Sequence, residues 1–291
     1  MRLYWYISFF VFLTTKLCVA QNYTIIDSQS KESIPFAAIE ILGKNEGFFT
    51  NEKGNFFLDT TEIRKIKISC LGYNNLITEN KLMKDTIFLI PKLESLSEVI
   101  VYSSKKETTT IGGKSKNIAW HLGQHDQLGV LLKPQADYKQ SFIEEILIPI
   151  GKLPATTESK QKQFESVFRL HLFSNENNQP NIPLLKTPII IHCNEKSNKL
   201  LRVNISNKNI QFTSEGLFVC LEMIGEIDND GQVIEKKNFV PNFKFTDKQN
   251  KYFSSHSYFK PSNSDIWISV NKFLDKEIFL ALNLVVSINE N

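Results

Sequence analysis

From Gln21 onward, the apolar residues of this chain alternate with polar ones or occur in short runs separated by turn residues. No stretch sustains the 3.6-residue period of a long amphipathic helix. Runs of roughly four to eight residues with this pattern are typical of β-strands. Hydrophobic residues make up 42% of the chain and charged residues 22%, which is enough apolar material for a buried core. The pattern therefore predicts an all-β globular protein.

The first 20 residues have the order of a secretory signal peptide. Arg2 precedes an apolar run over Leu3–Leu13, and Cys18–Ala20 supplies the small residues of a cleavage site before Gln21. As a helix, this run would rise only about 16 Å, against about 30 Å of bilayer hydrocarbon, so a membrane anchor is disfavoured. We expect cleavage after Ala20 and export to the periplasm, the outer membrane or the medium.

A polar segment separates two groups of expected strands. The first group comprises residues 23–26, 36–42, 48–50, 55–58, 66–70, 75–78, 86–89 and 99–102. The second group comprises residues 118–120, 127–132, 143–150, 166–173, 189–192, 200–205, 217–227, 266–270 and 278–288. Residues 103–117 hold almost nothing apolar and two adjacent glycines, which is typical of a linker. We therefore expect one β-sandwich over residues 21–102 and a second over residues 118–291.

Charge and cysteine content exclude several classes. The net charge of +3 gives no general electrostatic reason to bind nucleic acid or an anionic membrane. No segment after the signal approaches 18 uninterrupted apolar residues, so we expect no transmembrane helix in the mature chain. The mature chain keeps Cys70, Cys193 and Cys220, an odd and sparse set that is not a disulfide framework. A single bridge between Cys193 and Cys220 stays open.

Four ordered segments in the first group carry a family resemblance. They are Ile34–Ile39 (IPFAAI), Thr50–Phe56 (TNEKGNF), Ile68–Tyr73 (ISCLGY) and Leu96–Val101 (LSEVIV). In this order and spacing they resemble the carboxypeptidase regulatory-like domain, a prealbumin-like β-sandwich of secreted and outer-membrane proteins of Bacteroidetes-type bacteria. The resemblance implies that Gly54 and Gly72 occupy backbone turns, that Tyr73 packs onto the sandwich, and that none of these residues is catalytic.

The resemblance extends more weakly beyond the first domain. Leu96–Val101 looks like the segment that leads into the plug of a TonB-dependent transporter, but only 190 residues follow Val101, too few for a plug and a large barrel. Phe168–Phe173 and Gly216–Glu222 look like parts of the jelly-roll half of uncharacterised two-domain proteins in the same group. That second resemblance implies no known activity.

One sequence match suggests zinc. His192 and Glu195 have the His-x-x-Glu spacing by which zinc carboxypeptidases hold their metal. A catalytic zinc also needs a third protein ligand and an open position, for which His256 or His171 are the candidates. Because the chain lacks the helices and length of a peptidase domain, we favour a strand-end histidine beside a solvated glutamate.

Two further segments have weaker metal patterns. His121 and His125 would share one face of a helix, but Gly123 between them favours a loop. Glu226–Gly231 resembles the opening of a calcium loop, whose twelfth position here is Lys237 and cannot supply the usual bidentate carboxylate. We expect an Asp-Gly hairpin there, and calcium binding at Asp228 and Asp230 stays open.

The sequence therefore predicts no catalytic, cofactor or metal site. We expect a non-enzymatic, exported envelope protein that acts as a binding, scaffolding or assembly module, with an envelope protein or polysaccharide as its partner. A first alternative is a carbohydrate-binding accessory module that stacks sugars on Trp120, Tyr138, Tyr258 or Trp267, although aromatic residues more often lie in the core. A second alternative is a metallohydrolase.

Overall fold

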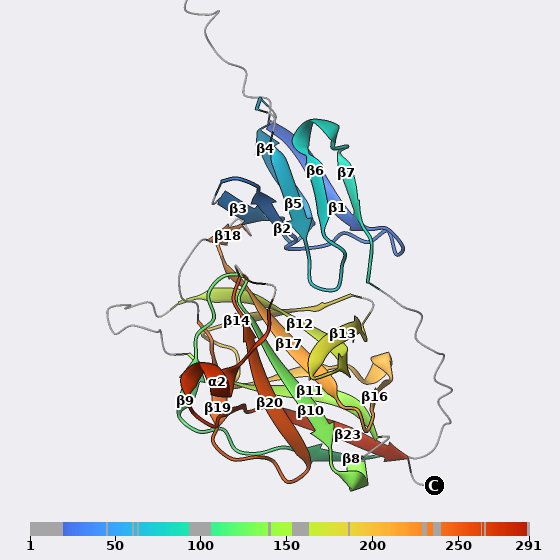
Figure 1. The fold of residues 1–291 in the computed structure, drawn as a ribbon, viewed down its shortest axis with the longest axis vertical. Coiled ribbons are helices and arrows are strands. Elements are labelled where there is room, and N and C mark those ends of the chain that lie inside the picture. Colours follow the sequence, from blue (N-terminus) through green and yellow to red (C-terminus); the bar gives the residue numbers. More distant parts are fainter. Residues whose placement is uncertain are drawn as a thin grey trace, which may run out of the picture. The chain divides into compact units, whose positions relative to one another are not determined.

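The computed structural model describes residues 20–289 except 45, 60, 63, 93–105, 139–140, 153–162, 186, 229–231, 235–239, 263 and 265. The chain divides into two compact units, Met1–Ile90 and Pro91–Asn291 (Figure 1). Both units are built from strands, and the one α-helix among the described residues is α2 (Val270–Leu274). The predicted all-β class is confirmed. No helix in the described part of the chain has the length and apolar character to cross a bilayer.

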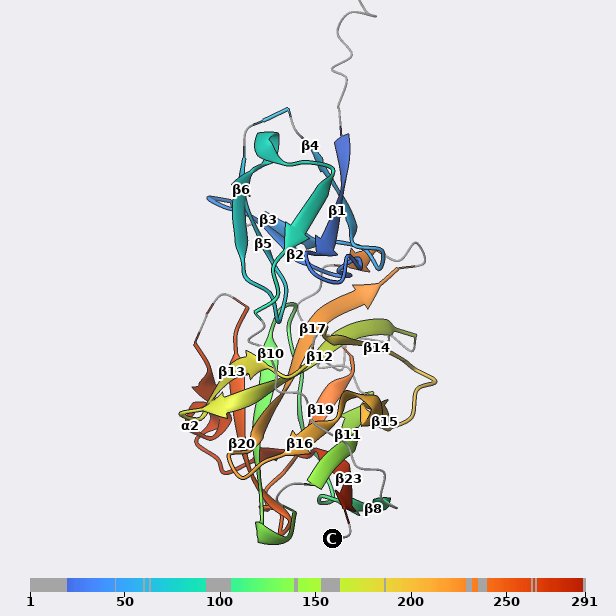
Figure 2. The ribbon, with the colours of Figure 1, turned by 90° about the vertical axis from the view of Figure 1, so that its right-hand side faces the viewer.

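The first unit is a β-sandwich. Its strands are β1 (Ala20–Asp27), β2 (Ala38–Ile41), β3 (Glu46–Phe49), β4 (Asn55–Asp59), β5 (Lys65–Ser69), β6 (Leu76–Glu79) and β7 (Thr86–Leu89), with a short 3-10 helix η1 (Asn80–Leu82). One sheet has the order β4-β1-β7 and the other the order β3-β2-β5-β6. The pair β1–β7 is parallel, and Figure 2 shows these strands side by side.

Period-two burial explains the core of the first unit. On β4, Phe56 and Leu58 are buried while Phe57 between them is 66% exposed, as expected for a strand with one face on a core. Phe56 lies opposite Tyr23 of β1, and the two rings stack with centroids 5.1 Å apart. Such cross-strand pairs fix the register of β1 and β4.

The structure confirms the roles that the family resemblance implies for two glycines and a tyrosine. Gly54 has a φ of +74°, and a Cβ added there would lie 2.8 Å from the carbonyl oxygen of Ile25. Gly72 has a φ of +89°. Tyr73 is 2% exposed and donates its hydroxyl to Oδ2 of Asp27 at 2.9 Å. Glycine adopts such positive φ values more readily than any other residue because it has no Cβ.

The second unit contains two eight-stranded sheets. Its strands are β8 (Lys106–Ile111), β9 (Ile118–Trp120), β10 (Gln127–Pro134), β11 (Ser141–Gly151), β12 (Glu165–Glu176), β13 (Gln179–Pro183), β14 (Ile189–Asn194), β15 (Leu200–Asn204), β16 (Ile210–Phe212), β17 (Leu217–Ile227), β18 (Val233–Ile234), β19 (Asn242–Thr246), β20 (Phe253–Lys260), β21 (Ile268–Ser269), β22 (Phe279–Leu280) and β23 (Asn283–Asn289). Two further 3-10 helices are η2 (Ala136–Tyr138) and η3 (Ser206–Lys208).

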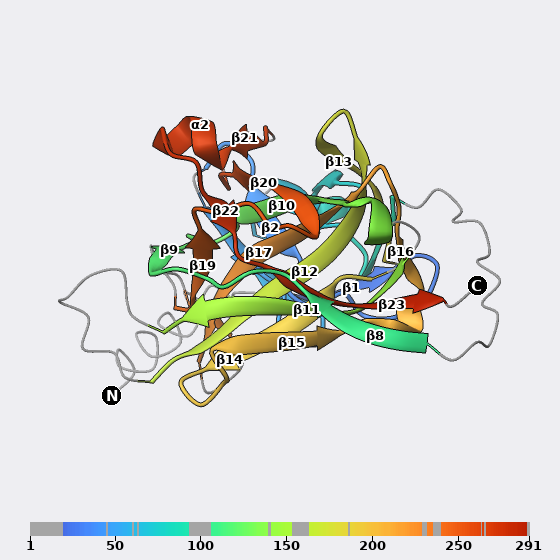
Figure 3. The same cartoon turned by 90° about the horizontal axis from the view of Figure 1, so that it is seen from below.

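The two sheets of this unit enclose its core. The first sheet follows the order β13-β12-β17-β10-β20-β21, with β14 on β12 and β18 on β17. The second follows β22-β19-β11-β23-β8, with β15 and β16 on β11 and β9 on β19, and Figure 3 shows β8, β23, β11 and β15 of this sheet together. On β12, Phe168, Leu170 and Leu172 point into the core cluster. Their neighbours Arg169 and His171 therefore lie on the opposite face, called the outer face below.

The predicted linker is wrong for residues 106–111. These residues form β8, which pairs antiparallel with β23. Threonines 108–110 are β-branched and favour strands, and an edge strand needs backbone partners on one side only. The side chains of the three threonines are exposed, which gives the segment the polar composition of a loop. Ile111 at the end of β8 is nevertheless fully buried.

Strand β20 was missed for a related reason. Its core-facing positions between Phe253 and Phe259 are Ser255 and Ser257, which are buried but interrupt the apolar pattern. Ser257 Oγ accepts a hydrogen bond from the backbone N–H of Leu280 at 2.7 Å. The expected strand over 266–270 is a strand only at Ile268–Ser269, and the expected strand over 99–102 lies outside the described residues.

Candidate functional site

The structure separates the residues that the disfavoured zinc hypothesis would require. His192 lies on β14 opposite Val167 of β12, and its Nδ1 is 4.0 Å from Oε1 of Glu165. His171 is four residues beyond Val167 on the same strand, which places it about 13 Å farther along at about 3.3 Å per residue. That spacing exceeds any metal–ligand pair.

His256 is farther away still. It lies on β20, and β12, β17 and β10 separate β20 from β14 in the sheet. Four strand spacings of about 4.8 Å put β14 and β20 about 19 Å apart. Among the described residues, no group of three or more His, Cys, Asp or Glu side chains is arranged to hold a metal ion. The metallohydrolase hypothesis at His192 and Glu195 therefore loses its geometric basis.

The other two metal patterns form turns. His121 and His125 belong to a loop, in which the N–H of Asp126 donates to the carbonyl of Gly123 at 3.1 Å. His121 Nε2 lies 3.4 Å from Nδ2 of Asn242, whereas His125 Nδ1 lies 4.0 Å from Oε1 of Glu222. The preference for a loop over a metal-binding helix is confirmed.

Asp228 closes the turn between β17 and β18. Its N–H donates to the carbonyl of Gln232 at 2.9 Å, and its Oδ1 accepts the N–H of Gln232 at 2.8 Å. This contact supports the expected hairpin, while residues 229–231 of the calcium-like segment lie outside the described residues.

Among the described residues, Cys70, Cys193 and Cys220 are buried and form no disulfide. Cys193 belongs to the core cluster, whereas Cys220 lies on the outer face opposite His171. The two thiols are thus on opposite faces of one sheet, and no bridge joins them. Burial raises the pKa of both thiols, which keeps them protonated and unreactive.

The outer face carries a row of polar residues across four strands. Arg169 of β12 lies opposite Glu222 of β17, which lies opposite Gln127 of β10, which lies opposite Lys260 of β20. We call these four residues the polar row. Cross-strand neighbours of opposite charge stabilise a sheet, so the alternation of cation, anion, amide and cation is favourable.

A buried ion pair forms one end of the polar row. Arg169 Nη1 lies 2.8 Å from Oε2 of Glu222, with the two side chains 1% and 7% exposed. His125 Nδ1 approaches the other oxygen of Glu222 to 4.0 Å. The pair is protected from screening by salt, and losing either partner would leave a buried charge uncompensated.

His171 lies beside the polar row on β12. The residue is fully buried, its ring stacks on Phe173 with centroids 4.7 Å apart, and its Nδ1–H donates to the carbonyl of Leu172 at 2.9 Å. Burial, with the nearby Arg169 charge adding to it, lowers the pKa of His171 from 6.5 to about 4. The imidazole is therefore neutral at pH 7.

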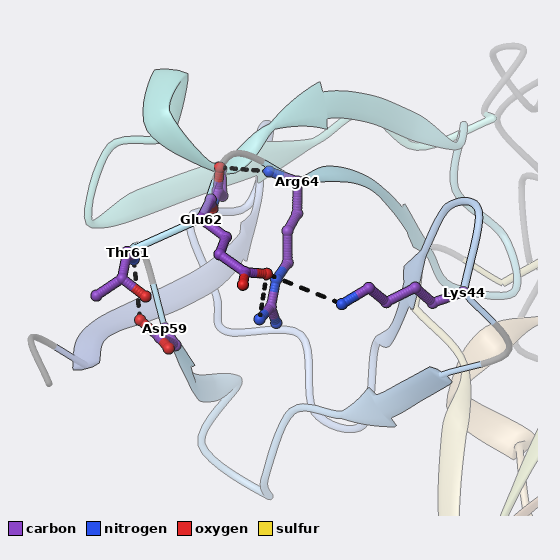
Figure 4. Close-up of polar contacts among 6 residues, drawn as sticks. Lys44, Asp59, Thr61, Glu62 and Arg64 are labelled. Atoms are coloured by element: carbon purple, nitrogen blue, oxygen red, sulfur yellow. Dashed lines mark hydrogen bonds and ion pairs between the residues drawn. The ribbon is translucent and has the colours of Figure 1, made fainter.

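A polar cluster in the first unit is structural. Glu62 Oε2 lies 3.2 Å from Nη2 of Arg64 and 3.8 Å from Nζ of Lys44, as Figure 4 shows. The buried Asn80 side chain accepts the N–H of Arg64 and donates to the carbonyl of Glu62. Glu62 is 63% exposed, so these ion pairs contribute little to stability, and the contacts serve to hold the β4–β5 loop.

Of the candidate sugar-binding aromatics, Trp120 belongs to the core side, whereas Tyr258 and Trp267 both lie on the outer face at Gly129. Trp120 packs against the core, with its ring centroid 5.1 Å from that of Phe259. Trp267 lies over Gly129 of β10, where an added Cβ would be 2.8 Å from the indole. Tyr258 packs on Phe218, with ring centroids 5.5 Å apart. Both tryptophans are half-buried.

Three exposed apolar side chains of the second unit lie within residues 266–274, at α2 or just before it. Ile266 is 71% exposed, Phe273 is 56% exposed and Leu274 is 37% exposed. The Phe273 ring stands 5.7 Å from that of Trp120, which supports it from the core side. We call Ile266, Phe273 and Leu274 the α2 patch. The pattern of residues 266–270 predicted a strand and not this patch, although the adjacent pair Phe273-Leu274 between charged residues was an available signal.

Comparison with known proteins bears on the first unit and the residues that directly follow it. The family model of the CarboxypepD_reg-like domain matches residues 24–101, which include β2 to β7 and the second half of β1. No curated protein matches the chain. The residues of this match contain all four motifs on which the resemblance was based, and the first part of the chain is therefore similar to CarboxypepD_reg-like domains.

Proposed function

We propose that this chain is an exported, non-enzymatic protein of the bacterial cell envelope whose second unit binds another envelope protein through the α2 patch. The observation that carries the proposal is the exposure of Ile266, Phe273 and Leu274 within one short segment. Exposed apolar side chains that gather in this way are typical of interaction sites. Two aliphatic side chains beside one phenylalanine offer few hydrogen bonds, so they suit an apolar protein surface better than sugar hydroxyls.

The absence of an enzymatic role is supported by the chemistry of the buried groups. The thiols of Cys193 and Cys220 are buried, and burial raises their pKa values, so neither is an accessible thiolate nucleophile. His171 is enclosed by packed side chains and therefore unavailable for proton transfer to a substrate. The matched family is also a regulatory-like domain, which agrees with a supporting role.

The compartment and origin belong to the same proposal. The signal-like order of residues 1–20 supports export to the periplasm, the outer membrane or the medium. The family resemblance of the first unit supports a Bacteroidetes-type source. The two facing antiparallel sheets of the second unit support a jelly-roll-like sandwich.

A pull-down from detergent-solubilised envelope of the source bacterium tests this proposal. The bait is the mature chain, residues 21–291, compared with Phe273→Ser and with Phe57→Ser as a matched control. Phe57 is also an exposed phenylalanine, 66% exposed, but belongs to the first unit. We expect the wild type and Phe57→Ser to recover a discrete envelope protein. We expect Phe273→Ser to recover at least tenfold less of that protein. Equal recovery by all three baits contradicts a role for the α2 patch.

A carbohydrate-binding module remains the second candidate because Trp267 is half-buried and not sealed in the core. Stacking of a sugar on an indole is a common mode of glycan recognition, with the polar groups nearby giving specificity. Glycan-array binding that is lost in Trp267→Ala and kept in Phe273→Ser would favour this candidate over a protein partner.

A further inference from the structure

His171 lies among charged and titratable groups from every strand around it. On its own strand β12 the nearest is Arg169, and β17 contributes Cys220 and Glu222. The other elements that reach this part of the outer face contribute Gln127 of β10, Tyr258 and Lys260 of β20, and His125 of the loop before β10. Glu222 is the one carboxylate among these residues.

The surroundings fit a neutral imidazole. Nδ1–H donates to the carbonyl of Leu172, and Nε2 has no hydrogen-bond partner among the residues that the structure describes. The ring packs against Phe173 on one face and is fully buried. A proton on Nε2 would create a buried N–H without an acceptor and a buried positive charge, both of which are costly.

The nearest carboxylate is already engaged. Glu222 Oε2 accepts a hydrogen bond from Arg169 at 2.8 Å, and Arg169 is two residues from His171 on the same face of β12. A protonated His171 would therefore be a second cation beside a buried ion pair, with no free anion to balance it. This charge can be solvated only if water reaches the outer face. Water can reach that face only if the packing between β12 and β17 loosens.

We propose that His171 is an acid-operated switch of the second unit, in which protonation of the imidazole at Nε2 loosens the outer face of β12 and β17. The lowered pKa of His171, about 4 against an ordinary 6.5, agrees with this geometry. The unfolded chain binds the proton more readily than the folded chain, so stability is complete above pH 6.5 and is lost as pH falls towards 4. Linkage predicts an about 20-fold rise in the unfolding equilibrium constant between pH 7 and pH 5.

Tryptophan fluorescence isolates this unit in the test. The mature chain keeps only Trp120 and Trp267, and both lie in the second unit. In urea unfolding of residues 21–291 at pH 7, 6 and 5, the unfolding equilibrium constant of the wild type should rise about 20-fold from pH 7 to pH 5. The control His256→Gln removes an exposed histidine of the same sheet and should show the same rise. His171→Phe should reduce the rise to less than threefold. An equal rise in His171→Phe overturns the proposal.

An NMR titration keeps the proposal testable if His171→Phe does not fold. The chain contains five histidines, whose ring signals are followed from pH 7.5 to pH 4.5 in the folded wild type. We expect the His171 ring, identified by its absence from His171→Gln or by through-space contacts to Phe173, to stay neutral above pH 5. A His171 ring that titrates near 6.5 in the folded protein would refute the switch.

Discussion

Removing one partner of the Arg169–Glu222 pair should destabilise the second unit far more than removing both. Arg169→Met leaves the Glu222 carboxylate buried at 7% exposure without its 2.8 Å partner. Loss of one partner of such a pair typically costs about 3–5 kcal/mol, whereas replacement of both by apolar residues is often nearly neutral. We therefore expect Arg169→Met to lower the free energy of unfolding by about 3–5 kcal/mol. The double variant with Glu222→Met should recover most of that loss.

Urea unfolding at pH 7, followed by tryptophan fluorescence, measures the difference. With a slope of about 2–3 kcal/mol per molar urea, the single variant should shift the midpoint down by about 1–2 M. The matched control is Arg202→Met, because Arg202 Nη1 lies 2.7 Å from Oε2 of Glu145 but is 62% exposed. An exposed pair contributes less than about 1 kcal/mol. If Arg169→Met costs no more than Arg202→Met, or if the double variant costs more than Arg169→Met alone, the account of the polar row is wrong.

Two further predictions concern the first unit and the thiols. Gly54→Ala should destabilise the first unit by about 1–3 kcal/mol, because its φ of +74° disfavours a Cβ and the added atom would lie 2.8 Å from the Ile25 carbonyl oxygen. Urea unfolding followed by far-ultraviolet circular dichroism measures this loss of stability. An unchanged unfolding midpoint would argue against the proposed role of Gly54 in the turn. The folded mature chain should resist a thiol reagent at pH 8 and release three thiols in denaturant without reductant, since Cys70, Cys193 and Cys220 are buried and free. A release of only one thiol would mean that two of them form a disulfide.

The sequence predicted most of the strands because their core-facing residues alternate with period two. Strand β17 was expected over residues 217–227 and is found there. The failures occur where the alternating residues are polar. Thr108–Thr110 form an edge strand whose side chains stay in solvent, and Ser255 and Ser257 fill core positions of β20 with their hydroxyls hydrogen-bonded or packed.

The candidate sites depended on information that local pattern does not contain. The spacing of Arg169 and His171 places them on one face of a strand, but their burial depends on contacts formed elsewhere in the fold. The separation of His192 from His256 depends on the order of strands in the sheet, which puts four strand spacings between β14 and β20. By contrast, the turn roles of Gly54 and Gly72 followed from motifs that require a particular backbone, and the structure has that backbone.

The central claim is that the second unit binds an envelope protein through the α2 patch, and photo-crosslinking in living cells of the source bacterium tests it most directly. A photoreactive phenylalanine analogue would replace Phe273 in one strain and Phe57, which is at least as exposed, in another. The account predicts a discrete crosslinked envelope protein from position 273 and none of that species from position 57. No adduct from position 273, or the same adduct from both positions, would contradict it.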